Sequence, residues 1–447
     1  MIAAMATPAS LQRMGRMLPS APVRSEVYGL RLLAQPSGRR AVLVLIVAIL
    51  AVFRVLQLVV LSTDRMWAAD FSYYWTAGSQ LLHGGSIYSA EQLAGPFVPE
   101  DQTGFLYPPA FAVLMLPFAA LFPTDPRAAG WLWAAIGAAI LAASVWAVVR
   151  TEGLDRRFEW LPRPRALWFV AAALFLPTVI AELSVGNVHL EILGLLSLAW
   201  VCLRESERRG GGTGAGAGWE WLAGAAVGAA ALLKVFPGVL LLWFVATRRW
   251  RGAAGVIVGA GVLAALSLPF TGLQPWLDYP RVLANMGLVL DVHDSVSPTM
   301  WLTPVLGFDV ARWLVTLAGV ALLVWAARAR SNVVSFAIAV VVAVVIAPSV
   351  FHHYLAVLVL PLLLALSGGV PVWVVALSYF LMWGGQQPAL GEWSWVLSRV
   401  PQTLGWVLLL AGLAMHSAAR PSKPTEADNH RLHKATAGGQ DRLPWRR

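Results

Sequence analysis

The 447-residue sequence contains few charged side chains, only 13% of the total, whereas 58% of its residues are hydrophobic. Soluble globular proteins carry roughly 25% charged residues, so this chain lacks the charge to cover a water-exposed surface. The low charge excludes a soluble enzyme, a disordered chain and a DNA-binding domain. Long uncharged runs, such as residues 41–53 and 333–348, indicate instead an all-α protein that crosses a membrane many times.

Cysteine and the common nucleotide-binding motifs are also scarce or missing. Cys202 is the single cysteine, which excludes an internal disulfide framework and a cysteine-rich metal site. No GxGxxG, Walker or GxSxG motif occurs in a strand–turn–helix setting, so we expect no nucleotide site and no cofactor. Asp291, His293 and Asp294 could suggest a metal site. Without an HExxH motif or a cysteine cluster, we interpret them as a polar loop.

The charge that is present gathers at the two ends of the chain. Residues 1–40 carry six Arg and one Glu, and residues 416–447 carry seven Lys or Arg and three acids, so the tails account for nine of the ten net positive charges. Basic tails beside a hydrophobic body are typical of the cytoplasmic side. We therefore interpret these charges as signals of orientation and anionic-lipid contact, with no nucleic acid partner.

The hydrophobic body, residues 41–415, contains thirteen apolar stretches, of which the first is expected to be retained as a helix. The long segments 63–107 and 270–300 are acidic and are predicted to be extracytoplasmic, whereas the short basic connections are predicted to be cytoplasmic. If both termini are cytoplasmic, the chain must cross the membrane an even number of times. We therefore expect about twelve crossings, with residues 109–122 failing to cross.

Asp70 follows the first predicted crossing and begins a stretch with aromatic residues at helical spacing. This pattern predicts a helix that lies at the interface, with the carboxylate where lipid headgroups meet water. A solvated loop or a helix cap is the alternative interpretation. Tyr73, Tyr74 and Trp75 follow within about one and a half helical turns and are candidates to line a cavity beside Asp70.

Lys234 lies unusually deep for a charged residue in a hydrophobic region. It precedes Arg248 by 14 residues, about 21 Å along an unbroken helix, which is too far for snorkelling to the cytoplasmic interface. Its partner is predicted to be a carboxylate, Glu182 or Glu191, or the phosphate of a ligand. Pro237 is expected to break or kink the helix directly afterwards.

Further polar residues converge on the predicted external side, where ionisable groups are costly and often functional. Each of them also has a purely structural interpretation. Pro108 and Pro109 could form a rigid entry into the next membrane segment, and Gly186 could belong to a turn. The remaining candidates are Tyr107, Asn187, His189, Arg281, His352 and His353.

The order of these motifs resembles glycosyltransferase family 87, within the multispanning glycosyltransferases of the GT-C fold. The resemblance covers roughly residues 41–415. It is carried by Asp70-Phe71-Ser72-Tyr73-Tyr74, His83-Gly84-Gly85-Ser86-Ile87-Tyr88, Tyr107-Pro108-Pro109, Gly186-Asn187, Lys234-Val235-Phe236-Pro237, Arg248-Arg249-Trp250-Arg251 and His352-His353.

The resemblance implies a GT-C-type bundle that transfers a sugar, with inversion, from a polyprenyl-phosphate donor to a hydroxyl of a lipid-linked glycan. It implies that Asp70 is the general base, at the outer face of the plasma membrane. From charge and depth, Lys234, His352, His353 and Arg281 are the candidates to bind the donor phosphate. Tyr107, Asn187 and His189 join the aromatic residues beside Asp70 as the expected substrate cavity. No metal is expected to be required, since the leaving group is already a phosphate.

Mannose is favoured as the transferred sugar, and arabinofuranose from decaprenyl-phosphate arabinose is the alternative. A transporter of polyprenyl glycolipids is a hypothesis from another class, although no half-repeat of the kind typical of transporters is visible. A polymerase or ligase of surface polysaccharide would place a larger polar loop late in the chain.

Overall fold

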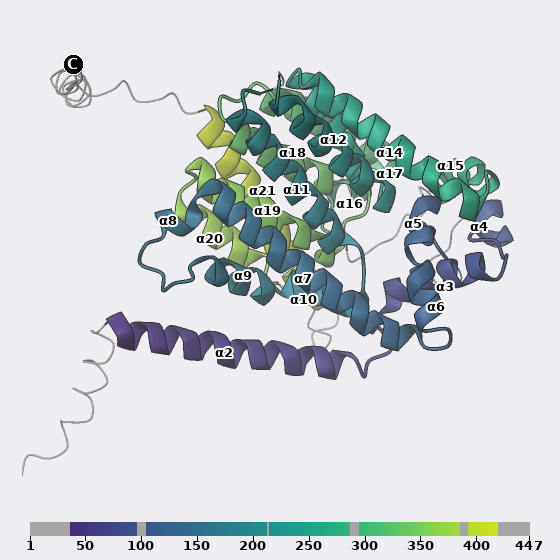
Figure 1. The fold of residues 1–447 in the computed structure, drawn as a ribbon, viewed down its shortest axis with the longest axis horizontal. Helices are drawn as coiled ribbons and strands as arrows, with labels where there is room; N and C mark the ends of the chain where they lie inside the picture. The colour runs from purple at the N-terminus through teal and green to yellow at the C-terminus, as the bar shows by residue number, and fades with distance from the viewer. Residues whose placement is uncertain (1–35, 96–103, 212–213, 287–294, 385–391, 419–447) are drawn as a thin grey trace, which may run out of the picture. The chain divides into compact units, whose positions relative to one another are not determined.

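The computed structural model describes residues 36–95, 104–211, 214–286, 295–384 and 392–418. Within these ranges every regular element is a helix (Figure 1), which confirms the predicted all-α class. Asp291, His293 and Asp294 lie outside the described residues.

α2 (Pro36–Leu61) belongs to a unit of its own, Met1–Val60, and the remaining chain forms the second unit, Leu61–Arg447. Residues Ala41–Leu61 of this helix are long enough and apolar enough to cross a membrane. This segment coincides with the first predicted crossing.

Three helices of the second unit also have the length and composition of a membrane span: α7 (Pro126–Glu152), α14 (Trp250–Thr271) and α17 (Phe308–Ala326). α9 (Ala166–Phe175) and α10 (Pro177–Val185) qualify as a pair that is bent by 67°. The bend follows from Pro177, because the residue before a proline is driven out of the helical region and Leu176 is extended. The twelve crossings stay a prediction, since the described residues contain four such helices, or five with the bent pair.

The other helices of this unit are shorter, more polar or more deeply buried. They are α3 (Ala69–Leu82), α4 (Ala90–Ala94), α5 (Pro109–Leu114), α6 (Leu116–Leu121), α8 (Leu154–Arg157), α11 (His189–Arg208), α12 (Gly216–Leu233), η2 (Phe236–Val239), α13 (Leu240–Ala246), α15 (Gln274–Met286), α16 (Pro298–Leu306), α18 (Asn332–Val345), η3 (His352–Leu358), α19 (Val359–Gly368), α20 (Val372–Leu381) and α21 (Glu392–Ala418).

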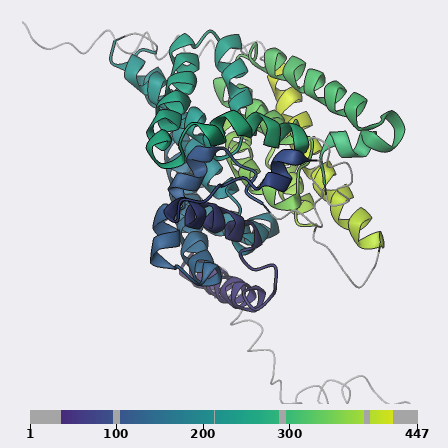
Figure 2. The same ribbon diagram turned by 90° about the vertical axis from the view of Figure 1, so that its right-hand side faces the viewer.

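The short helices α3, α4, α5, α6 and α15 gather at one end of the second unit (Figure 1), where α4 contacts α15 and α3 packs on α5 and α6. Turned by 90°, the green and yellow C-terminal helices lie together on the right of this unit (Figure 2). The segment 109–122, which was predicted not to cross, is divided at Met115 into α5 and α6, each of six residues.

The core of the unit is built around α18. Every side chain from Val333 to Val345 is buried, and the helix contacts α17, α19 and α21. A helix that is hydrophobic on all sides is stable only inside a protein or a membrane, so the apolar run of residues 333–348 explains this central position.

α12 and α14 pack unusually closely because small residues line their contact. A side chain carbon added at Gly224 would lie 2.0 Å from the Gly252 carbonyl oxygen, and one at Gly228 would lie 2.4 Å from that of Val256. Such small-residue contacts are typical of helix pairs in membranes. α12 begins at Gly216, within the glycine- and alanine-rich residues 214–218. The helix ends at Leu233, before Pro237, which confirms the predicted break.

Candidate active site

Asp70 is the second residue of α3 and follows a tight turn. The Ala68 backbone is left-handed (φ 53°), and its N–H donates to the Ser184 carbonyl at 2.8 Å, which ties the start of α3 to α10. Phe71 is fully buried and packs against Trp133 of α7. These contacts hold the start of α3 in place, and the predicted helix at Asp70 is confirmed.

Asn187 orients the Asp70 carboxylate. Its Nδ2 donates to Asp70 Oδ2 at 2.7 Å, while its Oδ1 accepts the Val188 N–H at 2.7 Å, and this second bond assigns the direction of the amide. Gly186 makes this turn possible, since its φ is 71° and a side chain carbon would lie 2.7 Å from Phe71 Cβ. The Asp70 side chain remains 31% exposed, so its carboxylate is accessible to a ligand.

Asp70 has a raised pKa, mainly because burial disfavours its charged form. The hydrogen bond from Asn187 and the positive charge of Lys234 act in the opposite direction and lower the pKa, in that order of size, without cancelling the effect of burial. A carboxylate with a raised pKa is a stronger base than an ordinary aspartate, which suits proton abstraction.

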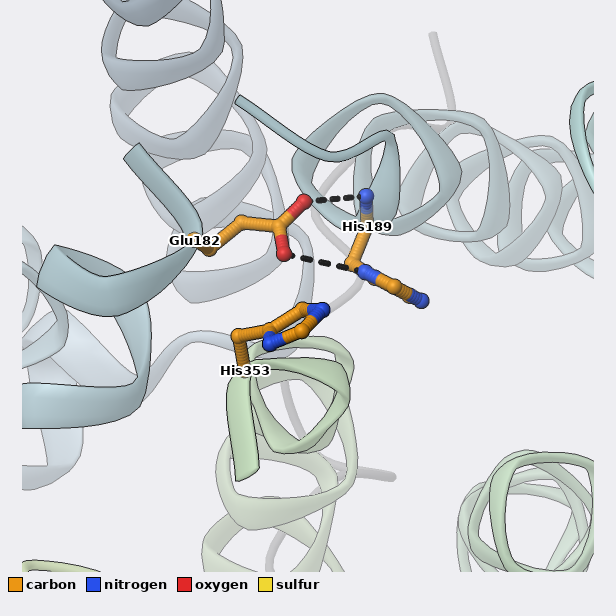
Figure 3. A group of neighbouring side chains, drawn as sticks. All are labelled: Glu182, His189 and His353. Atoms are coloured by element: carbon orange, nitrogen blue, oxygen red, sulfur yellow. Dashed lines mark hydrogen bonds and ion pairs between the residues drawn. The ribbon is translucent and has the colours of Figure 1, made fainter. Parts of the chain in front are cut away.

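Lys234 ends a chain of contacts that begins at a buried glutamate. Glu182 accepts hydrogen bonds from the backbone N–H of His189, at 2.6 Å, and from the Nδ1–H of its ring, at 2.9 Å (Figure 3). The other ring nitrogen of His189, Nε2, lies 3.3 Å from Lys234 Nζ. These partners assign the proton to Nδ1 and leave Nε2 as the acceptor for the ammonium group. Of the two carboxylates predicted as partners of Lys234, Glu182 therefore acts through His189.

Tyr354 was not identified from the sequence, although it directly follows the histidine pair. Lys234 Nζ lies 3.7 Å from the centre of its ring, within cation–π range. His353 Nε2 lies 3.8 Å from Asp70 Oδ2, and the edge of the half-buried His352 ring stands against the ring of His353. The start of η3 therefore brings Tyr354 to Lys234 and His353 to Asp70.

The other predicted site residues differ in how closely they approach this cluster. Tyr74 donates to the hydroxyl of Tyr107 at 2.7 Å, and the ring of Tyr107 lies 5.5 Å from Lys234 Nζ. Tyr73 is half-buried. The indole N–H of Trp75 donates to the Phe122 carbonyl at 2.9 Å, and this hydrogen bond anchors α3.

Arg281 lies on α15 and is exposed. Nothing in the described residues connects it with the cluster around Lys234. Its predicted contact with the donor phosphate stays a prediction.

Glu182, His189 and His353 are also close enough to hold a metal ion, because one potential ligand atom of each lies within 4.8 Å of the others (Figure 3). The hydrogen bonds already made do not fit that function. Nδ1 of His189 carries a proton that it donates to Glu182, and the lone pair of Nε2 already faces Lys234. Neither ring nitrogen is therefore free to bind a metal ion, and the ammonium group would repel one. We therefore derive no catalytic step through a metal.

Residues 105–361 match the profile of glycosyltransferase family 87. The chain belongs to this family. The match includes Tyr107, Asn187, His189, Lys234 and the histidine pair, whereas Asp70 precedes it. Membership of family 87 confirms the resemblance seen in the sequence, and the protein is a membrane-embedded glycosyltransferase.

Relatives of this family 87 protein include two kinds of enzyme. The chain is 27% identical over 359 residues to a polyprenol-phosphate-mannose-dependent alpha-(1-2)-phosphatidylinositol pentamannoside mannosyltransferase of Mycolicibacterium smegmatis, covering 76% of this chain and 80% of the relative. It is 26% identical over 227 residues to an alpha-(1->3)-arabinofuranosyltransferase of Mycobacterium tuberculosis, covering 50% of this chain and 46% of the relative. Among solved structures, ArnT from Cupriavidus metallidurans in the apo state aligns with a TM-score of 0.42 at 18% identity, covering 83% and 78% of the two chains.

The raised pKa of Asp70 predicts the pH dependence of the reaction. A base must be deprotonated, so kcat/KM should fall as the pH drops through the pKa of Asp70, at a pH above the ordinary aspartate value of about 3.9. Replacing Asn187 with alanine removes a bond to the charged form, so the acid limb should move to still higher pH. A pH profile of both proteins tests this. An unshifted limb in Asn187→Ala would contradict the assignment.

The chain from Glu182 to Lys234 predicts that Glu182 positions the lysine. In Glu182→Gln the charge-assisted bonds to His189 are weakened, so we expect the donor KM to rise roughly tenfold with little change in kcat. Glu191→Gln is a matched control, because this buried glutamate makes no hydrogen bond within the described residues and lines an apolar pocket of about 740 Å³. Equal effects of the two substitutions would rule out the positioning role.

Proposed function

We propose that this protein transfers mannose from a polyprenyl-phosphate donor to a hydroxyl of a lipid-linked glycan, with inversion at the anomeric carbon. One observation carries the proposal: an accessible carboxylate, Asp70, is held by Asn187 beside a lysine that no described carboxylate pairs directly. A base and a cation close together are what this displacement requires. A relative that aligns with 76% of the chain is named as a mannosyltransferase, which supports mannose.

In the proposed reaction, Asp70 removes the proton of the acceptor hydroxyl as its oxygen attacks the anomeric carbon. The bond between that carbon and the phosphate oxygen breaks, and the polyprenyl phosphate leaves with an additional negative charge. Lys234 lies where it can stabilise this charge, and Tyr354 and His189 hold the ammonium group in place. A single displacement of this kind inverts the configuration.

We place the reaction at the outer face of the plasma membrane, with both basic tails in the cytoplasm. In this arrangement residues 41–415 form a GT-C-type bundle of about twelve crossings. The bent pair α9 and α10 would form one further crossing beyond the four long helices. The helices α11, α12, α13, α18, α19, α20 and α21 would supply the other seven. The proposed partners are the polyprenyl-phosphate sugar, the glycolipid acceptor and membrane lipids, without a resident cofactor or metal.

The test uses the full chain, purified and reconstituted in liposomes, with polyprenyl-phosphate donors labelled in the sugar. Phosphatidylinositol mannosides serve as acceptor probes. We expect label to move from the mannose donor into the acceptor with the opposite anomeric configuration. Transfer from decaprenyl-phosphate arabinose alone would establish the alternative suggested by the arabinofuranosyltransferase relative. Movement of intact donor between leaflets without a new glycosidic bond would establish a transporter.

A further inference from the structure

A second, smaller pocket lies along α3, the helix that carries Asp70. Its volume is about 200 Å³. The residues that matter for its chemistry are Ser72, Tyr73, Thr76 and Gln80 of α3, Gln92 of α4 and Phe105. We call it the α3–α4 pocket.

The lining of the α3–α4 pocket is polar but carries no charge. Its polar groups are hydroxyls and amides, with the rings of Tyr73 and Phe105 beside them. The Ser72 and Thr76 hydroxyls donate to backbone carbonyls of α3 at 2.6 and 2.8 Å, so their lone pairs remain to accept hydrogen bonds. Such a lining fits a neutral molecule rich in hydroxyl groups. It contrasts with the 740 Å³ pocket, whose lining is mainly leucine and alanine and suits a hydrocarbon chain.

The position of the pocket follows from the geometry of α3. Thr76 and Gln80 come six and ten residues after Asp70, which corresponds to about 9 and 15 Å along the helix axis. Tyr73 stands one turn from Asp70 and lines the pocket, so it connects the two places. A molecule in the α3–α4 pocket would therefore lie along the same helix as Asp70, on a neighbouring face that Tyr73 borders, without occupying the position of the reacting hydroxyl.

The floor of the pocket is held firmly by α4. The Gln92 side chain donates to the Phe105 carbonyl at 3.2 Å and accepts the Ser89 N–H at 2.9 Å. Gly104 is packed against this side chain so closely that an added carbon would lie 2.1 Å from Gln92 Nε2. The floor is therefore preorganised, whereas Thr76 and Gln80 are exposed at its rim, where they can contact a ligand.

We propose that the α3–α4 pocket binds a sugar unit of the acceptor glycan next to the unit that receives the new sugar. This proposal rests on the proposed function, because it assumes that the acceptor is a glycan. The pocket would then make the enzyme selective for acceptor length. A monosaccharide would bind only beside Asp70, whereas a longer glycan would bind beside Asp70 and in the α3–α4 pocket.

The test compares octyl mannoside with an octyl mannotrioside as acceptors for the reconstituted full chain. We expect the wild type to prefer the trioside, and the double variant Thr76→Val with Gln80→Leu to lose roughly tenfold of this preference while its kcat/KM for octyl mannoside stays unchanged. Both residues are exposed on a helix, so the fold should tolerate the change. Ser79→Ala, on the same helix outside the pocket, is the matched control and should keep the wild-type preference.

Three results would overturn the proposal: an equal loss with both acceptors, an unchanged preference, or a rise in the donor KM instead of the acceptor KM. Binding of methyl mannotrioside, followed by saturation-transfer NMR without any donor, separates this proposal from the proposed function. If the wild type transfers no sugar at all, binding that the double variant weakens still supports the pocket. Binding that the double variant leaves unchanged overturns it.

Discussion

Asp70→Asn is expected to lower kcat by roughly 10²–10⁴, while the KM values of donor and acceptor change little. The amide has nearly the same shape as the carboxylate and can still accept the 2.7 Å bond from Asn187, so α3 should keep its place. What it cannot do is take a proton. A sugar hydroxyl is a poor nucleophile, and without the base no positioned group takes its proton. Initial rates at saturating donor and acceptor measure the effect.

Asp64→Asn provides the matched control for this substitution. Asp64 is exposed in the turn before α3, where its carboxylate accepts the Met66 N–H at 2.8 Å. The substitution removes one negative charge near the same segment without touching the cluster, so we expect activity close to that of the wild type. If Asp70→Asn retained full activity with a normal thermal unfolding profile, Asp70 would not be the base.

Asp70 and Lys234 could be selected as candidates from the sequence because each differs from its local surroundings. Asp70 stands out because it begins an aromatic, helix-forming stretch directly after a predicted crossing. Lys234 stands out because it lies 14 residues from Arg248 within an apolar region. The break before Pro237 was predictable for the same reason, since proline acts on its own helix. Helical character was likewise predictable from the long apolar runs.

The contacts that make these residues a site were not predictable, because they join distant parts of the chain. Asn187 lies 117 positions from Asp70, and His189 lies 45 positions from Lys234. Helical periodicity places side chains on a face but does not select the neighbouring helix. The choice between Glu182 and Glu191 therefore stayed open until the structure placed Glu182 against His189.

The donor-phosphate prediction shows the same limit. Arg281 and Lys234 carry the same charge and both lie on the predicted external side, yet Arg281 is exposed on α15 whereas Lys234 is half-buried against aromatic rings. Exposed charges are screened by water and salt, so equal charge does not mean equal effect on a ligand. Sequence alone gives no measure of that difference.

Lys234→Met should lower kcat/KM for the donor by roughly 10²–10³, mainly through a higher donor KM. Methionine keeps the length of the side chain and its packing against Tyr354 but removes the charge. The phosphate of the donor is already an anion before the reaction and gains charge as the sugar leaves, so the lysine should contribute to donor binding and also to the rate. Acceptor KM should stay unchanged, since the charge of Lys234 acts on the phosphate. Donor titrations at fixed acceptor separate these quantities.

Lys234→Arg tests whether charge alone is sufficient. Arginine restores a cation and can stack on the Tyr354 ring, but its larger planar group cannot keep the ammonium position that lies both 3.7 Å from the ring centre and 3.3 Å from His189 Nε2. We therefore expect partial recovery relative to Lys234→Met, and Arg281→Ala should raise the donor KM less than either substitution. A normal donor KM in Lys234→Met would remove the lysine from the phosphate site. A larger effect of Arg281→Ala would move that site towards α15.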